Sequence, residues 1–524
     1  MNTRTVPFAA VPGFNRLFLD YVSASEKVKP FYDHFPSTEG YRAAAKAMRY
    51  EEKYRAIVAD ALRAQYERDG VALPLELLEK FAMPETLTVT TGHQLCLFTG
   101  PMYFIFKIVT AINLAEKTEK ETGKKVVPVY WMATEDHDFD EIASVNLFGK
   151  TLTWQKPAEG AVGRLRTDSM AALLQELKTV MGESEAAVKL HAMFEEVYRP
   201  GRSLAAATRE LVHRLFDGKV LVLDGDDASL KKLFIPYFRE DIFSNVTFRD
   251  VSITIAELEK NGYDIQVKPR GINVFFLGEN SRERIEEKEG NYHVLHSSLS
   301  FTKEGLDAEL NEHPEKFSPN VTLRPVYQQV LLPNLAYVGG PGELVYWLEY
   351  KKMFETVGAF FPVLQPRNFG LLVDANTSGR LAKLGLQAEN LFGEIEQIIK
   401  QFVSTEELSL DAEKENIRSA FDGVIAKAEA SDVTLKKAAE AELQKALNSL
   451  EALQGKMLRA QKQKQETSVN QLRKLHAKFF PNGVLQERYE NFIPYFLDQP
   501  DFIAMLLESF KPNTEGLLVM TAEN

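Results

Sequence analysis

Five acidic residues and one histidine are crowded into residues 135–141, shortly after the apolar run KKVVPVY. Like charges this close raise one another's free energy unless a ligand, a cation or a helix N-terminus stabilises them. Carboxylate neighbours raise the proton affinity of His137, which suits acid/base chemistry near neutral pH, and the same groups could coordinate a divalent cation. The structural alternative is a helix N-cap at Asp136 or Asp138, with the later acids in the first turn. We take His137, Asp136 and Asp138 as catalytic candidates and Glu135 as a binding candidate.

Three further polar motifs end or follow apolar runs: TGHQ at residues 91–94, GGPGE at 339–343 and QPRN at 365–368. Glycine lets a ligand approach the backbone closely, and amide groups at a helix start attract anions. The structural alternative is that these residues form tight turns with capping side chains. GGPGE also lacks the lysine and hydroxyl of a P-loop. With His93 as a further catalytic candidate, the binding candidates in these motifs are Thr91, Gly92, Gln94, Gly339, Gly340, Gly342, Glu343, Arg367 and Asn368.

Positive side chains must offset the acids if an anionic substrate binds. Arg324 and Arg367 each lie beside a proline, which restricts the backbone, and arginine pairs with carboxylates through two hydrogen bonds. Gln328, in the same motif as Arg324, is also a binding candidate. Lys107 interrupts an apolar helix and faces either the site or solvent at the helix edge. Cys96 lies in the apolar run QLCLF, where a thiol is usually buried and inert.

Strand-like and helix-like runs alternate through the first part of the chain. The β-branched run Leu87–Thr91 is followed by an apolar helical segment at 102–120 and a second strand-like run at 125–133. Strand, helix and strand over this length make a βαβ unit, which implies a parallel sheet buried on both faces. The pattern returns at 202–223 and again at 335–366. Because ligands bind at the carboxyl ends of strands in open parallel sheets, we expect the four polar motifs to meet in one crevice.

The segment from about residue 250 to 322 interrupts this alternation, and we interpret it as an α+β insertion. We expect a hairpin in it, made by the run YDIQVKP, a turn at Gly271 and the run NVFFLGE. The sequence therefore predicts an α/β core over residues 1–374 that carries N-terminal helices and this insertion.

The composition changes between about residues 375 and 478, where prolines are absent and Ala, Glu, Lys, Gln and Leu dominate. Apolar residues then recur at spacings of four and three, which is typical of a heptad seam. The clearest run is Ala439, Leu443, Ala446, Leu450, Leu453, Met457 and Ala460. A break at Glu429–Thr434 separates it from an earlier run, which predicts an antiparallel coiled-coil arm over residues 375–478. Such a seam is typical of a structural arm whose outer edge could pair with a second copy, so we expect a homodimer. The tail, residues 479–524, is expected to return to the core.

Charge and cysteine content narrow the class of protein. The 524 residues carry a formal charge of −12, with Lys+Arg 62 against Asp+Glu 74, so an overall attraction to nucleic acid is not expected. A single cysteine excludes an intrachain disulfide and a cysteine-based zinc site. Neither a signal peptide nor a membrane-spanning run is recognised, and we expect a cytoplasmic protein without a membrane partner.

The motifs together resemble those of a known family. The segments TGHQLCLFTGPMYFIFK, VPVYWMATEDHDFDEI, SPNVTLRPVYQQVLLPNLAYVGGPGELVYW and FPVLQPRN, in this order, are similar to those of the cysteine-adding enzymes of bacillithiol synthesis. The resemblance spans most of the chain and includes the helical arm. It implies a Rossmann-like parallel sheet similar to that of class I aminoacyl-tRNA synthetases, with connective insertions and a coiled coil associated with dimerisation.

The activity that this resemblance implies is that of a cysteine ligase. Such an enzyme joins L-cysteine to glucosaminyl-malate through an amide between the cysteine carboxyl and the sugar amine. Residues 91–94 fall where class I synthetases have a HIGH-like nucleotide turn, so ATP with Mg²⁺ is the expected co-substrate. The second synthetase signature, a lysine-serine-lysine loop, has no counterpart in this sequence. On this interpretation His137 removes the proton of the attacking amine, while Arg324 and Arg367 bind the carboxylates of malate.

Two other functions fit parts of the sequence. A nucleotide-sensing binding protein would use the coiled-coil arm to recruit a partner and would bind nucleotide without forming a product. A tRNA-aminoacylating relative would need an extended basic surface, which the net charge of −12 and the missing second signature disfavour.

Overall fold

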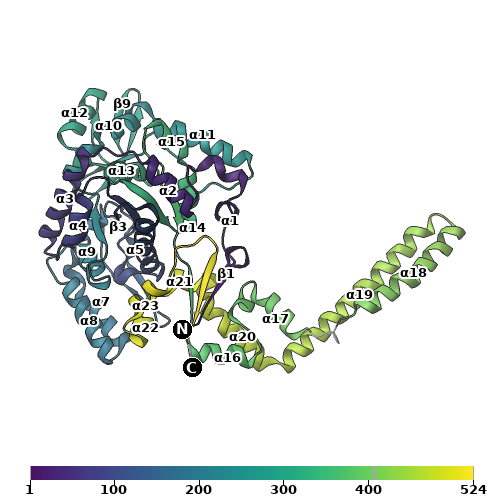
Figure 1. Cartoon of the computed structure of the whole chain (residues 1–524). Coiled ribbons are helices and arrows are strands. Elements are labelled where there is room, and N and C mark those ends of the chain that lie inside the picture. The colour runs from purple at the N-terminus through teal and green to yellow at the C-terminus, as the bar shows by residue number, and fades with distance from the viewer. Residues whose placement is uncertain (1, 405–408, 523–524) are drawn as a thin grey trace.

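A five-stranded parallel sheet forms the centre of the molecule (Figure 1). The computed structural model describes residues 2–404 and 409–522. Neighbouring strands follow the order β13-β12-β2-β3-β6, and every neighbouring pair is parallel. The bounds are β2 Leu87–His93, β3 Val126–Met132, β6 Leu221–Asp224, β12 Asn334–Gly339 and β13 Val363–Pro366. The predicted Rossmann-like parallel sheet is confirmed.

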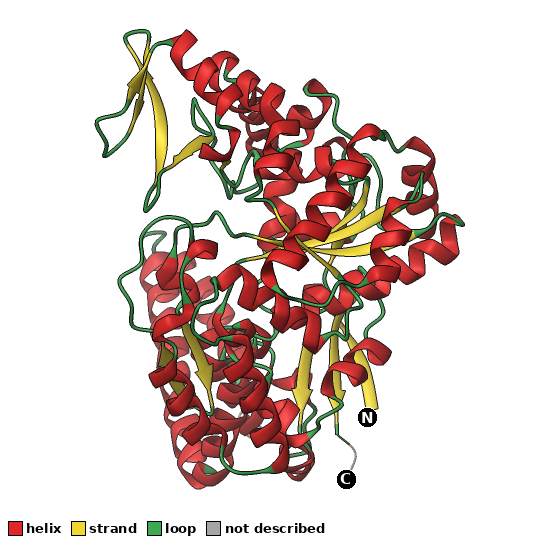
Figure 2. Cartoon of the chain, turned by 90° about the vertical axis from the view of Figure 1, so that its left-hand side faces the viewer, coloured by secondary structure: helices red, strands yellow, loops and turns green. Residues whose placement is uncertain are grey.

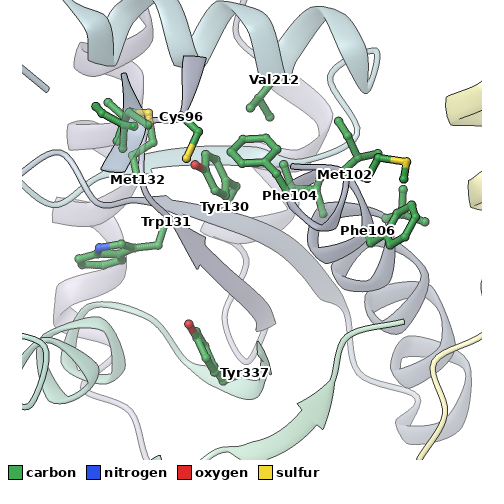
Figure 3. Packing of buried hydrophobic residues seen from close by; sticks show 14 of the residues in the cluster. Cys96, Met102, Phe104, Phe106, Tyr130, Trp131, Met132, Val212 and Tyr337 are labelled. Carbon is green, nitrogen blue, oxygen red and sulfur yellow. The ribbon is translucent and has the colours of Figure 1, made fainter. Parts of the chain in front are cut away.

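Apolar burial on both faces explains why these segments form the sheet. β2 and β3 are rich in β-branched and aromatic residues, and β3 is buried along its whole length. Along β3, Tyr130 and Trp131 extend to opposite faces, as adjacent residues of a strand do (Figure 3). Helix α5, Tyr103–Thr122, connects β2 to β3, packs against both and ends at Gly123, which adopts a left-handed conformation with φ 71°.

The strand order creates a switch point between β2 and β12. From β2 the chain builds outward through β3 and β6, and it later returns to the other side of β2 to form β12 and β13. Thr91 therefore has Tyr130 of β3 as its partner on one side and Val338 of β12 on the other. The loops after β2 and β12 leave the sheet in different directions, and ligands bind in crevices of this kind.

Helices surround the sheet on several sides. The N-terminal helices are α1 Arg16–Val22, α2 Thr38–Ala47, α3 Lys53–Asp69 and α4 Leu75–Ala82. The middle of the chain adds α6 Phe139–Ile142, α7 Ala171–Met181, α8 Glu185–Val197 and α9 Leu204–Leu215, with α14 Pro341–Leu348 and α15 Lys351–Thr356 between β12 and β13. A small hairpin, β4 Ser144–Leu147 with β5 Lys150–Thr153, follows the acidic turn.

An inserted lobe lies between β6 and β12, and its strands stand at one edge of the molecule (Figure 2). Its helices are α10 Ala228–Ser244, α11 Val246–Lys260, α12 Lys303–Glu312 and α13 Arg324–Leu331. Its antiparallel sheet has the order β10-β9-β8-β7-β11, with bounds β7 Val274–Leu277, β8 Arg282–Lys288, β9 Asn291–Val294, β10 Ser300–Phe301 and β11 Phe317–Pro319.

The predicted hairpin around Gly271 is wrong. The structure describes every residue from 263 to 273 and places none of them in a strand; β7 pairs instead with β8 and β11. The reason is that side chains satisfy the backbone of this segment. The amide of Gln266 donates to a carboxylate oxygen of Glu349 at 2.9 Å, so the segment does not need a strand partner there.

The predicted antiparallel arm is confirmed and projects away from the body (Figure 1). It consists of α18 Asp411–Ser431 and α19 Leu435–Lys464, and the break between them falls inside the predicted one. In the predicted seam, Ala439 is buried, whereas Leu453 remains 48% exposed; Leu447, which the prediction did not include, is also buried. Helices α16 Ala375–Lys383, α17 Ile395–Val403 and α20 Glu466–Phe479 form the base of the arm; residues 405–408 of the predicted helical region lie outside the described residues.

Both chain ends meet in a second small sheet. Strand β15 Gly516–Thr521 lies between β1 Asn2–Pro7, which is antiparallel to it, and β14 Gly370–Val373, which is parallel. The preceding helices are α21 Gln486–Tyr489, α22 Ile493–Asp498 and α23 Phe502–Ser509, and α23 packs on α5. The C-terminal segment thus contacts the helix that leads away from the switch point.

Candidate active site

A cavity of about 720 Å³ lies at the carboxyl ends of the parallel strands, where the switch point predicts a site. Its walls come from the turns after β2, β3, β12 and β13, from the inserted lobe and from the C-terminal segment. The sequence candidates that line it are Gly92, His93, Gln94, Lys107, Glu135, Asp136, Arg324, Gly340, Gly342, Glu343 and Arg367. The structure therefore brings residues of all four polar motifs together.

Several other candidates lie behind the cavity wall and support it. The hydroxyl of Thr91 donates to the carbonyl of Val338 at 2.8 Å, which ties β2 to β12. The side-chain amide of Asn368 donates to the carbonyl of Lys511 at 2.7 Å, and Gln328 accepts a hydrogen bond from Arg324 at 2.9 Å. Gly339 ends β12 without lining the cavity.

A buried lysine joins the two sides of the switch point. The ammonium of Lys107 is 2% exposed; it donates to the carbonyl of Gly92 and contacts the two carboxylate oxygens of Glu343 at 2.8 and 2.7 Å. Burial lowers the pKa of Lys107, and the carboxylate opposes that shift. Burial raises the pKa of Glu343, but Lys107 and the donors from Gly340 and Tyr337 outweigh it, so the net pKa lies below its usual value. The pair holds the two turns together, and Lys107 faces the site rather than solvent.

His93 lies at the end of β2 as a neutral imidazole. Its Nδ1 is 3.0 Å from the carbonyl of Gln94, which assigns the ring proton to Nδ1. The ring packs against Tyr103 and Phe104, and burial, reinforced by the charge of Lys107, lowers the pKa of His93 to about 4. Within the described part of the chain no hydrogen bond reaches Nε2, so this nitrogen keeps a lone pair that can accept a proton at neutral pH.

Acid is expected to destabilise the fold through His93. Its pKa falls from 6.5 to about 4 on folding, so its contribution to the free energy of unfolding is complete above pH 6.5 and is lost as the pH falls towards 4. The loss by pH 4.5 should be about 2 to 3 kcal/mol. Urea unfolding at pH 7 and 4.5 should show that wild type loses this much more than His93→Gln. An equal loss in the two proteins would show that His93 is not buried as a neutral ring.

The crowded acids after β3 are largely satisfied within the protein. The amide nitrogen of Gln94 donates to Asp136 at 2.9 Å and to Glu141 at 2.6 Å, so one neutral group bridges two carboxylates. Glu135 pairs at 2.7 Å with the fully buried ammonium of Lys231. Asp138 accepts from the amide of Glu141 and caps α6, as the structural alternative predicts. The acids thus form a wall that is partly neutralised yet still open to the cavity at Asp136 and Glu141.

His137 lies outside the cavity lining and is half exposed. Its Nδ1 is 3.1 Å from a guanidinium nitrogen of Arg282, which can only donate. The lone pair of Nδ1 is therefore engaged, and the ring carries its proton on Nε2. This geometry does not support the predicted role of His137 as the base that deprotonates the amine.

Among the positive groups that line the cavity, one arginine is already paired with a buried carboxylate. Arg367 pairs with Glu487 at 2.5 Å, and both side chains are almost completely buried. Arg324 lies near the rings of Trp131 and Tyr337, which Figure 3 shows in the adjoining core. Sequence reasoning missed four cations that line the cavity, Lys268, Arg270, Arg282 and Arg488. They come from the insertion and the C-terminal segment, where no periodic pattern indicates which side chain faces the sheet.

The Rossmann-like sheet, the charged cavity at its switch point and the coiled-coil arm define an α/β protein built to bind a polar small molecule. The chain matches two family descriptions: "Bacillithiol biosynthesis BshC, N-terminal Rossmann-like domain" over residues 1–368, and "Bacillithiol biosynthesis BshC, C-terminal coiled-coil domain" over residues 370–522. The chain belongs to this family, and the resemblance seen in the sequence motifs is confirmed.

Full-length relatives carry a common description. The "Putative cysteine ligase BshC" of Flavobacterium johnsoniae is 38% identical over 99% of this chain and 100% of its own length. The protein with the same name from Cytophaga hutchinsonii is 36% identical over 96% of this chain and 95% of its own. These names bear out the predicted enzyme class, a ligase.

A solved structure gives a much weaker likeness. A crystal structure described as a putative arginyl-tRNA synthetase from Campylobacter jejuni is 11% identical, with a TM-score of 0.22 over 88% of this chain and 99% of its own. No helix in the described part of the chain has the length and apolar character needed to cross a membrane.

Proposed function

We propose that the protein is a cytoplasmic ligase that forms an amide between the carboxyl group of L-cysteine and the amine of glucosaminyl-malate. The observation that carries the proposal is the cavity itself, in which a neutral histidine, open carboxylates and cations that pair with no carboxylate of the described residues meet at the switch point. An acceptor with an amine and two carboxylates needs groups of both signs. The relatives' description as cysteine ligases supports cysteine as the other reactant.

ATP with Mg²⁺ is the proposed co-substrate, because a free carboxylate has no leaving group for an amine to displace and ATP would supply one. The residues present fit the phosphates. Gly92 and Gly340 line the cavity without a side chain, which leaves room for a ligand there, and the buried Nε of Arg367, which has no hydrogen-bond partner among the described residues, lies beside Gly340. Arg488 adds a positive charge to the same cavity.

His93 is the group we assign to proton transfer. The acceptor amine is mostly protonated at neutral pH, and Asp136 and Glu141 would hold the ammonium at the acidic wall. The ammonium first releases one proton to solvent, and the neutral amine then attacks the carbonyl carbon. As the new carbon–nitrogen bond forms, the nitrogen becomes strongly acidic, so even an imidazole with a pKa of about 4 can take its proton at Nε2. The bond that forms joins nitrogen to the cysteine carbonyl carbon, and the bond that breaks releases the leaving group.

Reconstitution tests the proposal. The purified chain is incubated with L-cysteine and glucosaminyl-malate, with and without ATP and Mg²⁺, and the mixture is analysed by mass spectrometry. We expect the cysteine conjugate only in the complete mixture. Nucleotide binding without conjugate in any mixture would reject the ligase and favour the nucleotide-sensing alternative.

The coiled-coil arm is the proposed dimer interface. Its apolar residues are only partly covered by the arm itself: Val424 is 49% exposed and Leu453 48% exposed. A second copy packed over these residues would bury them. Sedimentation equilibrium should therefore give twice the chain mass of 59.2 kDa. The double variant Val424→Glu with Leu453→Glu should sediment as a monomer with unchanged helix content; a wild-type monomer would refute the interface.

A further inference from the structure

Two cations on the inserted lobe face the cavity without an acidic partner. Lys268 and Arg270 both line it, and among residues 2–404 and 409–522 no carboxylate lies within ion-pairing distance of either side chain. Arg324, at the start of α13, shares this property and faces the same cavity. An uncompensated positive group in a concave site is what a bound anion requires.

The backbone that carries these cations is held in place by buried polar groups. Asn273, which is 1% exposed, accepts a hydrogen bond from the amide of Arg270 at 3.1 Å and donates to its carbonyl at 2.7 Å. The buried carboxylate of Asp241 in turn accepts from the amide of Asn273 at 2.6 Å. Pro269, between the two cations, removes a further degree of backbone freedom. The lobe thus fixes the backbone of Arg270 while leaving its guanidinium exposed.

The other charges at the cavity leave these cations as the available anion site. Arg367 is neutralised by Glu487, and Arg282 is engaged with His137 and a backbone carbonyl. Arg488 lies on the C-terminal segment beside Tyr103 and is assigned to the phosphates. Gly92, Gly340 and the Nε of Arg367 lie at the ends of the parallel strands, where we place the phosphates of ATP. Lys268 and Arg270 lie on the inserted lobe instead.

We propose that Lys268 and Arg270, together with Arg324, form a carboxylate subsite that receives the acidic end of the acceptor. The inference rests on the proposed function and assigns the malate carboxylates to the lobe rather than to Arg367. Arginine and lysine bind carboxylates through charge-assisted hydrogen bonds, and carboxylates held there leave the other end of the acceptor for the acidic wall and His93.

The test compares Arg270→Met and Lys268→Met with Arg284→Met in the full chain. Arg284 lies on β8 of the same lobe, pairs with Glu286 at 3.6 Å and does not line the cavity, so it is a matched control. Because Asn273 holds only the backbone of Arg270, the fold should persist, which thermal unfolding verifies. Malate binding, measured by calorimetry, should weaken roughly 10- to 100-fold in Arg270→Met and change less than about twofold in Arg284→Met.

Kinetics supply the second readout. The KM for glucosaminyl-malate should rise by a similar factor in Arg270→Met, while ATP affinity and turnover of methyl glucosaminide, which has no carboxylate, stay unchanged. Equal malate binding by wild type and Arg270→Met, no malate binding by wild type, or a loss of ATP affinity with malate affinity intact would each overturn the subsite. If malate binding depends on Arg270 but wild type forms no conjugate, the subsite stands and the ligase fails. If conjugate forms with an unchanged KM in Arg270→Met, the ligase stands and the subsite fails.

Discussion

His93→Gln is expected to lower kcat for cysteine conjugation by about 10²- to 10⁴-fold, the range for loss of a positioned acid/base group. Glutamine can still donate to the carbonyl of Gln94 but has no nitrogen that accepts a proton. Because the wild-type imidazole is neutral near pH 7 and its pKa is about 4, the loss should be the same between pH 6.5 and 8. KM for cysteine and glucosaminyl-malate should stay within about threefold, since the proton moves only during the reaction.

His137→Ala is the matched control for that substitution. His137 lies outside the cavity lining, and its Nδ1 is engaged with Arg282, so kcat should fall less than about threefold, although KM for the acceptor can change through Arg282. Steady-state kinetics of the two variants side by side decide between the histidines. A large loss of kcat in His137→Ala with little loss in His93→Gln would restore the assignment made from the acidic sequence motif.

Arg367→Met is expected to lower the free energy of unfolding by about 3 to 5 kcal/mol, because it leaves the carboxylate of Glu487 buried without its cation. Arg367 is 1% and Glu487 0% exposed, and the amide of Gly370 donates to the same carboxylate at 2.9 Å. The pair joins the turn after β13 to α21, so its loss should also loosen the C-terminal segment. Urea unfolding followed by tryptophan fluorescence measures the change, since the three tryptophans lie in the folded core.

Two controls make this prediction specific. The double variant Arg367→Met with Glu487→Gln removes both charges and should recover most of the lost stability, because an amide oxygen can still accept from Gly370. Lys189→Met breaks a solvent-exposed pair with Glu185 and should leave the urea midpoint close to that of wild type. An Arg367→Met protein that unfolds at the wild-type urea concentration would show that the pair is not buried as described.

The central sheet and the place of the cavity could be predicted from the sequence because the signals are local. The apolar strands and α5 can be predicted from the pattern of apolar residues in short segments. Because the strands are parallel, the polar turns that follow them meet at one edge of the sheet. The pairing of Arg367 with Glu487 could not be predicted, since the partners are 120 positions apart and neither neighbourhood is unusual. Sequence reasoning therefore assigned Arg367 to the malate carboxylates without any sign that Glu487 neutralises its charge.

The roles of the two histidines depended on burial and tautomer, which adjacent residues do not determine. The acids around His137 indicated a base, but Gln94, Lys231 and the cap of α6 account for most of those acids. The pKa of His93 is lowered by burial among aromatic neighbours and by the charge of Lys107, and only the fold brings these groups to the ring. Arg270 was missed because an irregular loop, fixed by side-chain contacts, carries it to the cavity.

The most direct test of the account is a crystal structure of the protein bound to the cysteine conjugate of glucosaminyl-malate. We predict density for the conjugate in the cavity at the switch point, with the amide nitrogen beside His93 and the malate carboxylates on Lys268 and Arg270. A conjugate bound elsewhere on the molecule, with solvent alone in the cavity, would contradict the account.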